Sequence, residues 1–176
     1  MDTLKRSLTM NEYLDDLLEQ RMLIENALKE HVKEKTNFTG DESLLNLEAR
    51  IFSFWVISLI VKDKEFKEMF HQRFCNAIGL DRIQTQLFYV QIRSRHDNYD
   101  YSYSYSIGNH HKGYFLASVM SEIIVNQNSD FSIQKTRPMT DFNIDLGMFN
   151  FFSFWFNNIR DFTDKLKENY ILPSLN

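Results

Sequence analysis

The chain of 176 residues has little cysteine, proline or glycine, with one, two and five copies respectively. A single cysteine excludes an internal disulfide and a zinc site built from several thiolates. So few prolines and glycines predict long regular elements with few tight turns. Cys75 follows the apolar spacing of Phe70, Phe74 and Ile78, which indicates a buried, unreactive thiol.

The sequence also lacks an excess of positive charge and a long apolar run. Its net charge of −4 argues against a protein that binds nucleic acid over its whole surface, but is compatible with a local basic patch. The most apolar run, residues 51–61, is shorter than the roughly 20 residues that span a bilayer. The first residues contain no apolar segment typical of a signal peptide. We therefore expect a cytoplasmic protein with no membrane partner.

Familiar catalytic motifs are missing as well. The chain has no Gly-x-Ser-x-Gly elbow, no phosphate-binding P-loop and no dinucleotide-binding glycine pattern. These absences favour a protein that is not an enzyme and that needs no cofactor. An enzyme assembled from residues scattered along the chain is left open at this stage.

The composition, with 43% hydrophobic and 25% charged residues, predicts a single globular domain over residues 1–176. A helix that is apolar all round is a buried central helix, and this is our prediction for residues 51–61. The tetrapeptide Phe-Ser-Phe-Trp of residues 52–55 recurs at residues 152–155. Duplication and chance both explain the repeat. Either way we expect two aromatic-rich core helices, which could pair across the core.

Helix-start signals place other helices along the chain. Residues 9–12 read as a capping box, which opens a helix through about Lys35. Its apolar stripe has near-heptad spacing and could pack in a bundle or bind a partner helix. A second capping signal at residues 39–42 starts the central helix. This helix is expected to break near Asp63 and to resume over residues 65–78, with Gly79 ending it. Further helices are expected over residues 114–125 and 148–170.

A change of period between these helices predicts a β-hairpin over residues 86–107. Tyr99, Tyr101, Tyr103 and Tyr105 alternate strictly with other residues, which is typical of a strand. Residues 97–98 supply a plausible two-residue turn. The predicted fold class is therefore α+β and predominantly helical: a helical bundle around two aromatic-rich core helices with one β-hairpin packed on it.

The geometry of the predicted hairpin argues against a metal site formed by its neighbouring histidines. A hairpin places His96 at its tip and His110 at its far end, about 25–30 Å away at roughly 3.4 Å per residue. The adjacent side chains of His110 and His111 cannot easily reach one tetrahedral ion. We therefore expect no metal site.

The functional hypothesis is a non-enzymatic intracellular protein-interaction module, such as an accessory subunit or an immunity-type inhibitor. Its partner would be another protein, or a second copy, bound through the first helix. The alternative is a nucleic-acid-binding or RNA-processing domain that uses the basic hairpin and the loop after it. The residues of this alternative are Arg93, Arg95, His96, His110, His111 and Lys112. Arg160, where the last core helix turns polar, is a further candidate functional residue.

Overall fold

The computed structural model describes residues 5–61, 64–106, 113–128 and 142–173. Within these ranges the chain is predominantly helical with a small β element, as the sequence predicts. The helices are α1 (Met10–Lys35), α2 (Glu42–Ile60), α3 (Lys64–Ala77), α4 (Arg82–Ser106), α5 (Gly113–Met120) and α6 (Phe142–Asn169), with one π-helical turn η1 (Ser121–Val125) after α5. Two short strands, β1 (Arg6–Ser7) and β2 (Tyr170–Ile171), lie at the two ends of this order.

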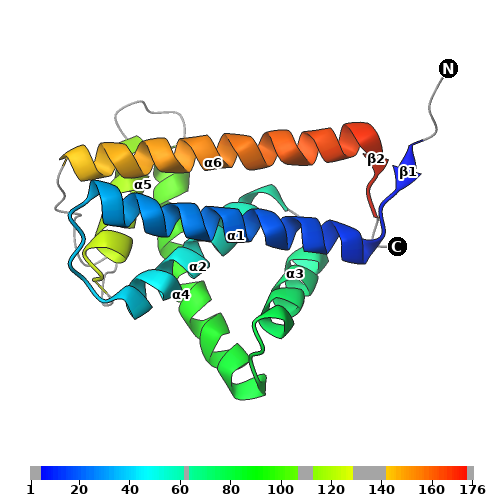
Figure 1. Cartoon of the computed structure of the whole chain (residues 1–176), viewed down its shortest axis with the longest axis horizontal. Coiled ribbons are helices and arrows are strands. Elements are labelled where there is room, and N and C mark those ends of the chain that lie inside the picture. Colours follow the sequence, from blue (N-terminus) through cyan, green and yellow to red (C-terminus); the bar gives the residue numbers. More distant parts are fainter. Residues whose placement is uncertain (1–4, 62–63, 107–112, 129–141, 174–176) are drawn as a thin grey trace.

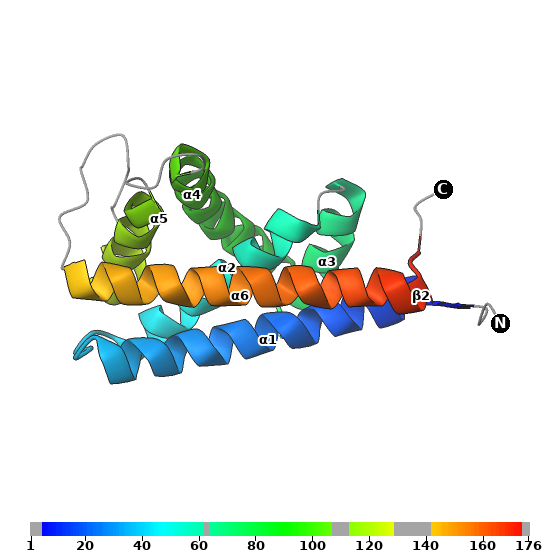
Figure 2. The same ribbon diagram turned by 90° about the horizontal axis from the view of Figure 1, so that it is seen from above.

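The two longest helices, α1 and α6, lie side by side and run in opposite directions (Figures 1 and 2). Helices α2 to α5 form a second layer behind them (Figure 2). In Figure 1, α3 and the first half of α4 extend downward from this layer and meet at a point. The first half of α4 therefore lies far from the α1–α6 pair.

Helix α2 is the centre of the fold, because seven consecutive residues, 51–57, are buried. By length and composition alone α2 could cross a membrane, yet 56% of the relevant window is buried inside the protein. Such burial is typical of the core helix of a bundle. Within the described chain, α2 is the one helix that meets this length and composition test.

The two Phe-Ser-Phe-Trp segments touch, which settles a possibility that the sequence analysis leaves open. The ring of Trp55 on α2 stacks on Phe152 of α6 with centroids 5.6 Å apart. Phe52 and Phe151 meet beside them at 6.5 Å. The Trp55 indole also donates a hydrogen bond of 2.7 Å to an Asp100 carboxylate oxygen, so its one polar group is satisfied.

Both predicted helix starts are confirmed. The Thr9 hydroxyl accepts a hydrogen bond from the Glu12 backbone N–H, and a Glu12 carboxylate oxygen accepts one from the Thr9 backbone N–H, at 3.2 and 2.9 Å. At α2 the cap is Asp41, whose carboxylate accepts from the backbone N–H groups of Ser43 and Leu44. These contacts satisfy N–H groups that have no partner within the helix.

The β element is a parallel pair between β1 and β2, with Arg6 opposite Tyr170. One further backbone hydrogen bond, from Leu8 N–H to the Ile171 carbonyl at 3.0 Å, extends the pairing. The strands join the beginning of α1 to the end of α6 (Figure 1).

The β-hairpin predicted over residues 86–107 is wrong, because residues 86–106 belong to helix α4. The tyrosines at alternate positions do not share one face: Tyr99 is fully buried, whereas Tyr101 is mostly exposed. The serines between them conceal the helical period. Ser102 is buried, and its hydroxyl donates to the Asn98 carbonyl at 2.8 Å. A hydrogen bond to the preceding turn lets a serine occupy an apolar helix face without an unsatisfied group.

Gly79 ends α3 as the sequence predicts, with a positive φ of 70°. Leu80 N–H donates to the Cys75 carbonyl at 3.1 Å across this turn. Gly79→Ala is therefore expected to lower the free energy of unfolding by about 1 kcal/mol, because a side chain disfavours positive φ. Urea denaturation measures the change.

Gly147→Ala is the matched control for this prediction. Gly147 lies inside α6, and a Cβ there would meet the His31 ring at an ordinary 3.4 Å. This variant should be neutral or more stable by up to about 1 kcal/mol, since alanine favours helix. Equal effects of the two substitutions would contradict the argument.

Candidate functional site

The residues predicted for nucleic-acid binding are not presented together by the described part of the chain. Arg93 is exposed on α4, but Arg95 and His96 are half-buried. His110, His111 and Lys112 lie outside the described residues. Arg160 is exposed on α6, where its Nε lies 3.9 Å from an Asp161 carboxylate oxygen.

Arg95 forms an ion pair with Glu48 of α2. Its Nε donates to both carboxylate oxygens at 3.0 and 3.2 Å, and a second guanidinium nitrogen lies 2.9 Å from one of them. Only 12% and 8% of the two side chains is exposed. Burial raises the pKa of Glu48, and the Arg95 guanidinium opposes that rise. The pair fixes α4 on α2, so Arg95 has a structural role on this geometry.

His96 lies with His71 at a pocket of about 310 Å³ between α2, α3 and α4. The pocket is lined by Ser58, Leu59, Lys67, His71, His96 and Asp100. Burial, with contributions from the charges of His96 and Lys67, lowers the pKa of His71 to about 3. Burial also lowers the pKa of His96 to about 4, although a hydrogen bond to the Ile51 backbone acts in the opposite direction. Both imidazoles are therefore neutral at pH 7.

Neutral imidazoles with such low pKa values are poor general bases at pH 7, since efficient proton acceptors have a pKa near the working pH. Among the residues that the structure describes, no group of three or more His, Cys, Asp or Glu side chains could hold a metal ion. Cys75, which lies in α3, is buried as predicted, and burial raises the pKa of its thiol. A raised pKa leaves little of the reactive thiolate.

The most exposed apolar side chains of α4 form one line, which we call the α4 stripe: Ile83, Leu87 and Val90. They are 69%, 62% and 70% exposed. Their spacing of four and three residues places them on one face of a helix. The opposite face of α4 packs into the core through Phe88 and Ile92. Helix α4 therefore has two apolar faces, and one of them is uncovered.

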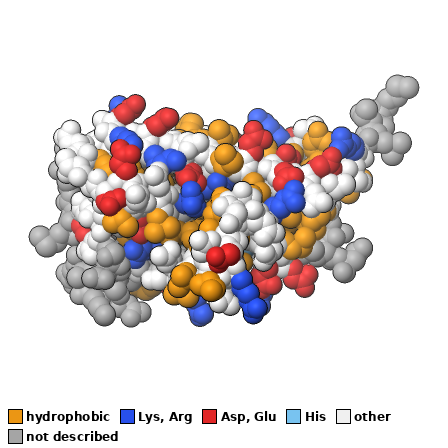
Figure 3. Space-filling model, turned by 60° about the horizontal axis from the view of Figure 1, so that its bottom comes forward, with side chains coloured by type: hydrophobic (Ala, Val, Ile, Leu, Met, Phe, Trp, Pro, Cys, Tyr) orange, Lys and Arg blue, Asp and Glu red, His pale blue; other side chains and the backbone are white. Residues whose placement is uncertain are grey.

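Charge borders the α4 stripe on one side. At 100° per residue, Arg82, Gln86 and Arg93 lie along one flank, and Gln84 and Gln91 lie along the other. Residues 82–96 contain no aspartate or glutamate. Neither Arg82 nor Arg93 forms an ion pair with a described residue. In the space-filling view of Figure 3, hydrophobic side chains (orange) lie next to basic ones (blue) near the lower edge of the molecule.

The apolar stripe of α1, through which the sequence analysis expects a partner to bind, packs mostly against the rest of the fold. Five apolar residues of α1 are buried against the rest of the fold: Leu14, Leu17, Ile24, Leu28 and Val32. This stripe is therefore occupied by the protein's own core. The signal that could have found the α4 stripe is the i, i+4, i+7 spacing of residues 83, 87 and 90, which the assignment of this segment to a strand concealed.

Two features thus stand out for function: the uncovered α4 stripe and the pocket at His71 and His96. The α4 stripe is exposed and apolar, and the arginines on its flank form no ion pair with a residue that the structure describes. Comparisons of the chain with family models, with curated proteins and with solved structures find no match.

Proposed function

We propose that this chain is a non-enzymatic, cytoplasmic protein-interaction module, such as an accessory subunit or an immunity-type inhibitor, which binds a protein partner through the α4 stripe. The observation that supports the proposal is the exposure of Ile83, Leu87 and Val90 in a single helical line. Recognition between helices uses apolar anchors at this spacing. Uncovered apolar patches on compact proteins commonly mark interaction sites.

The positive charge beside the α4 stripe indicates which kind of partner would bind there. Arg82 and Arg93 favour a helix whose apolar stripe has aspartate or glutamate along its flank. A second copy of the chain packed antiparallel on this face fits less well. Two α4 helices packed antiparallel would bring the arginine flank of one against the arginine flank of the other, and like charges disfavour that contact.

A designed peptide tests the proposal directly. The probe is a fluorescent helical peptide of about 20 residues with leucines at i, i+4 and i+7 and glutamates on its flanks. We expect saturable binding by fluorescence anisotropy that weakens as salt is added. Leu87→Ala should weaken binding about tenfold or more, because a central apolar anchor is lost.

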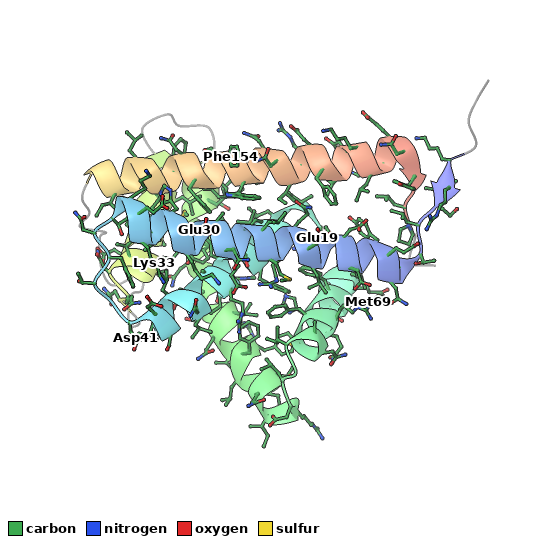
Figure 4. The ribbon with its side chains drawn as sticks, in the orientation of Figure 1. Glu19, Glu30, Lys33, Asp41, Met69 and Phe154 are labelled. Atoms are coloured by element: carbon green, nitrogen blue, oxygen red, sulfur yellow. The ribbon has the colours of Figure 1, made fainter. Side chains whose placement is uncertain are left out.

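Two controls make the result specific. A peptide with lysine in place of the flanking glutamates should bind much more weakly. Phe154→Ala removes an exposed aromatic of α6 that is not part of the α4 stripe, so it should leave binding unchanged (Figure 4). Equal binding of both peptides, or equal loss in both protein variants, would contradict the proposal.

Binding of nucleic acid is the second candidate function, supported by the exposure of Arg82 and Arg93 without an acidic partner among the described residues. Labelled single-stranded RNA distinguishes it from the first. Binding with a steep salt dependence, lost in Arg93→Ala but retained in Leu87→Ala, would favour this candidate. Shortened RNA on a denaturing gel would indicate an RNA-processing enzyme.

A further inference from the structure

A second pocket of about 310 Å³ lies between α1, α2 and the end of α3. Its volume is at the small end of the range of ligand pockets, about 300–1,000 Å³. Most of the wall is apolar, from Leu18, Met22, Phe74, Ala77 and Ile78. The polar part of the wall consists of Arg21, Glu25, Asn26 and Arg50.

Positive charge is in excess around Glu25, which lines this pocket together with Arg21 and Arg50, whereas Lys29 lies beside Glu25 and is not part of the wall. The carboxylate of Glu25 is the shared partner of three cations. Arg21 donates a hydrogen bond to it, Lys29 Nζ lies 3.5 Å away, and Arg50 Nε lies 3.7 Å away. No other acidic side chain pairs with these cations among the described residues. One negative charge therefore faces three positive ones.

Arg21 is the most deeply buried of these three cations. Its side chain is only 6% exposed, and its guanidinium carbon lies 4.5 Å from the centre of the Phe74 ring. A guanidinium over an aromatic face is stabilised by the ring's quadrupole. The Arg21 Nε is nevertheless buried without a hydrogen-bond acceptor among the described residues. A buried donor without an acceptor costs free energy.

Arg50 is the cation that a ligand could reach. Its side chain is 34% exposed and forms part of the pocket wall. Its guanidinium donates no hydrogen bond to a described side chain or backbone group, and its Nε is buried without an acceptor. The planar guanidinium presents paired N–H donors, which match the two oxygens of a carboxylate.

We infer that this pocket binds a small organic carboxylate with an apolar body. The carboxylate pairs with Arg50, and the charge of Arg21 lies behind it. The apolar body packs against Met22, Phe74 and Ile78. A hydrated inorganic anion gains nothing from these apolar walls, and a cation is repelled by the excess of positive charge. The inference does not depend on the α4 stripe.

Titration of the whole protein with octanoate, followed by calorimetry, tests the inference. Octylamine has the same chain with the opposite charge, and acetate has the same head without the chain. We expect saturable octanoate binding, with octylamine and acetate each at least about tenfold weaker. Binding should also raise the melting temperature, since the ligand stabilises the folded state.

Variants locate the site. Arg50→Gln should weaken octanoate binding at least about tenfold, the loss expected for one charge-assisted hydrogen-bonded contact. Ala77→Leu narrows the pocket without changing its charge and should weaken binding to a similar extent. Arg73→Gln is the matched control, because Arg73 pairs with Asp15 and does not line the pocket. It should leave binding unchanged.

A methyl NMR spectrum supplies a readout that does not depend on any variant. The chain has seven methionines, and Met22 lines the pocket, whereas Met148 is buried in α6. Octanoate should shift the Met22 methyl signal and leave that of Met148 unchanged. Octylamine binding as tight as octanoate binding, full affinity in Arg50→Gln, or an unmoved Met22 signal would each overturn the inference.

Discussion

Phe54→Ala is expected to lower the free energy of unfolding by about 3–5 kcal/mol, the range for deleting a buried aromatic side chain. Phe154→Ala changes the same residue of the second Phe-Ser-Phe-Trp segment and should cost about 0.5 kcal/mol or less. The neighbouring tetrapeptide residues are identical, so the contrast isolates burial. Denaturant unfolding of the two variants measures it.

The physical reason is the different surroundings of the two rings. Phe54 is fully buried, stacks on Phe70 at 4.8 Å and meets Phe74 at 5.3 Å. Phe154 is 61% exposed on the outer side of α6 and meets Trp155 edge to face. Alanine at position 54 leaves a cavity in the core, whereas at position 154 water fills the space that the ring occupied. Comparable losses would show that α6 buries its aromatic face differently.

Acid is expected to destabilise the protein steeply below pH 6.5. The folded-state pKa values of His71 and His96 lie at about 3 and about 4, below the ordinary value of 6.5. The unfolded chain therefore takes up protons first as the pH falls. Each histidine costs about 1.4 kcal/mol of stability per pH unit in this window, so the two together cost about 4 kcal/mol at pH 5. The raised pKa of Glu48 acts in the opposite direction and offsets part of this loss.

Unfolding free energies at pH 8, 7, 6 and 5 test this expectation. His71→Gln and His96→Gln each remove one titrating group, and each should reduce the slope below pH 6.5 by about half. The interval from pH 7 to pH 8 is the internal control, because most of the unfolded-state imidazole is already neutral there and the slope should be small. A flat profile down to pH 5 would contradict the proposed burial of neutral imidazoles.

The helices could be predicted from the sequence where local signals and burial agree. Helix ends are marked by Thr9 with Glu12, by Asp41 and by Gly79. Their hydrogen bonds or backbone conformation depend on only a few adjacent residues. The apolar run of residues 51–57 marks a helix buried all round. Both Phe-Ser-Phe-Trp segments could be assigned to core helices, but whether they touch was left open by the sequence and is decided by the packed fold.

Helix α4 could not be predicted in the same way. Its residues include many aromatic and β-branched types that favour strands, and tertiary packing overrides such preferences. Tyr99 is drawn inward by Phe52 and Trp55, at 5.6 and 5.1 Å, although its neighbours alternate like a strand. Only the packed fold shows which of the alternating residues are buried.

The pocket at Arg21 and Arg50 escaped prediction for a different reason. Its arginines belong to α1 and α2, and its apolar wall includes Phe74 from α3. In the sequence each is an ordinary residue on a helix, because the spacing of residues within one helix says nothing about residues on another. The Glu25 carboxylate that gathers the cations becomes visible only when the helices pack.

The pairing of β1 with β2 has a consequence for the order of folding. Arg6 and Tyr170 are almost as far apart along the chain as two described residues can be. Closing so long a loop costs conformational entropy, and two-residue strands return few hydrogen bonds. We therefore expect the strands to pair only after α1 and α6 have docked, since contacts this distant slow folding when they belong to its nucleus. We expect the β1–β2 pair to form late in folding and to open readily when the native protein fluctuates.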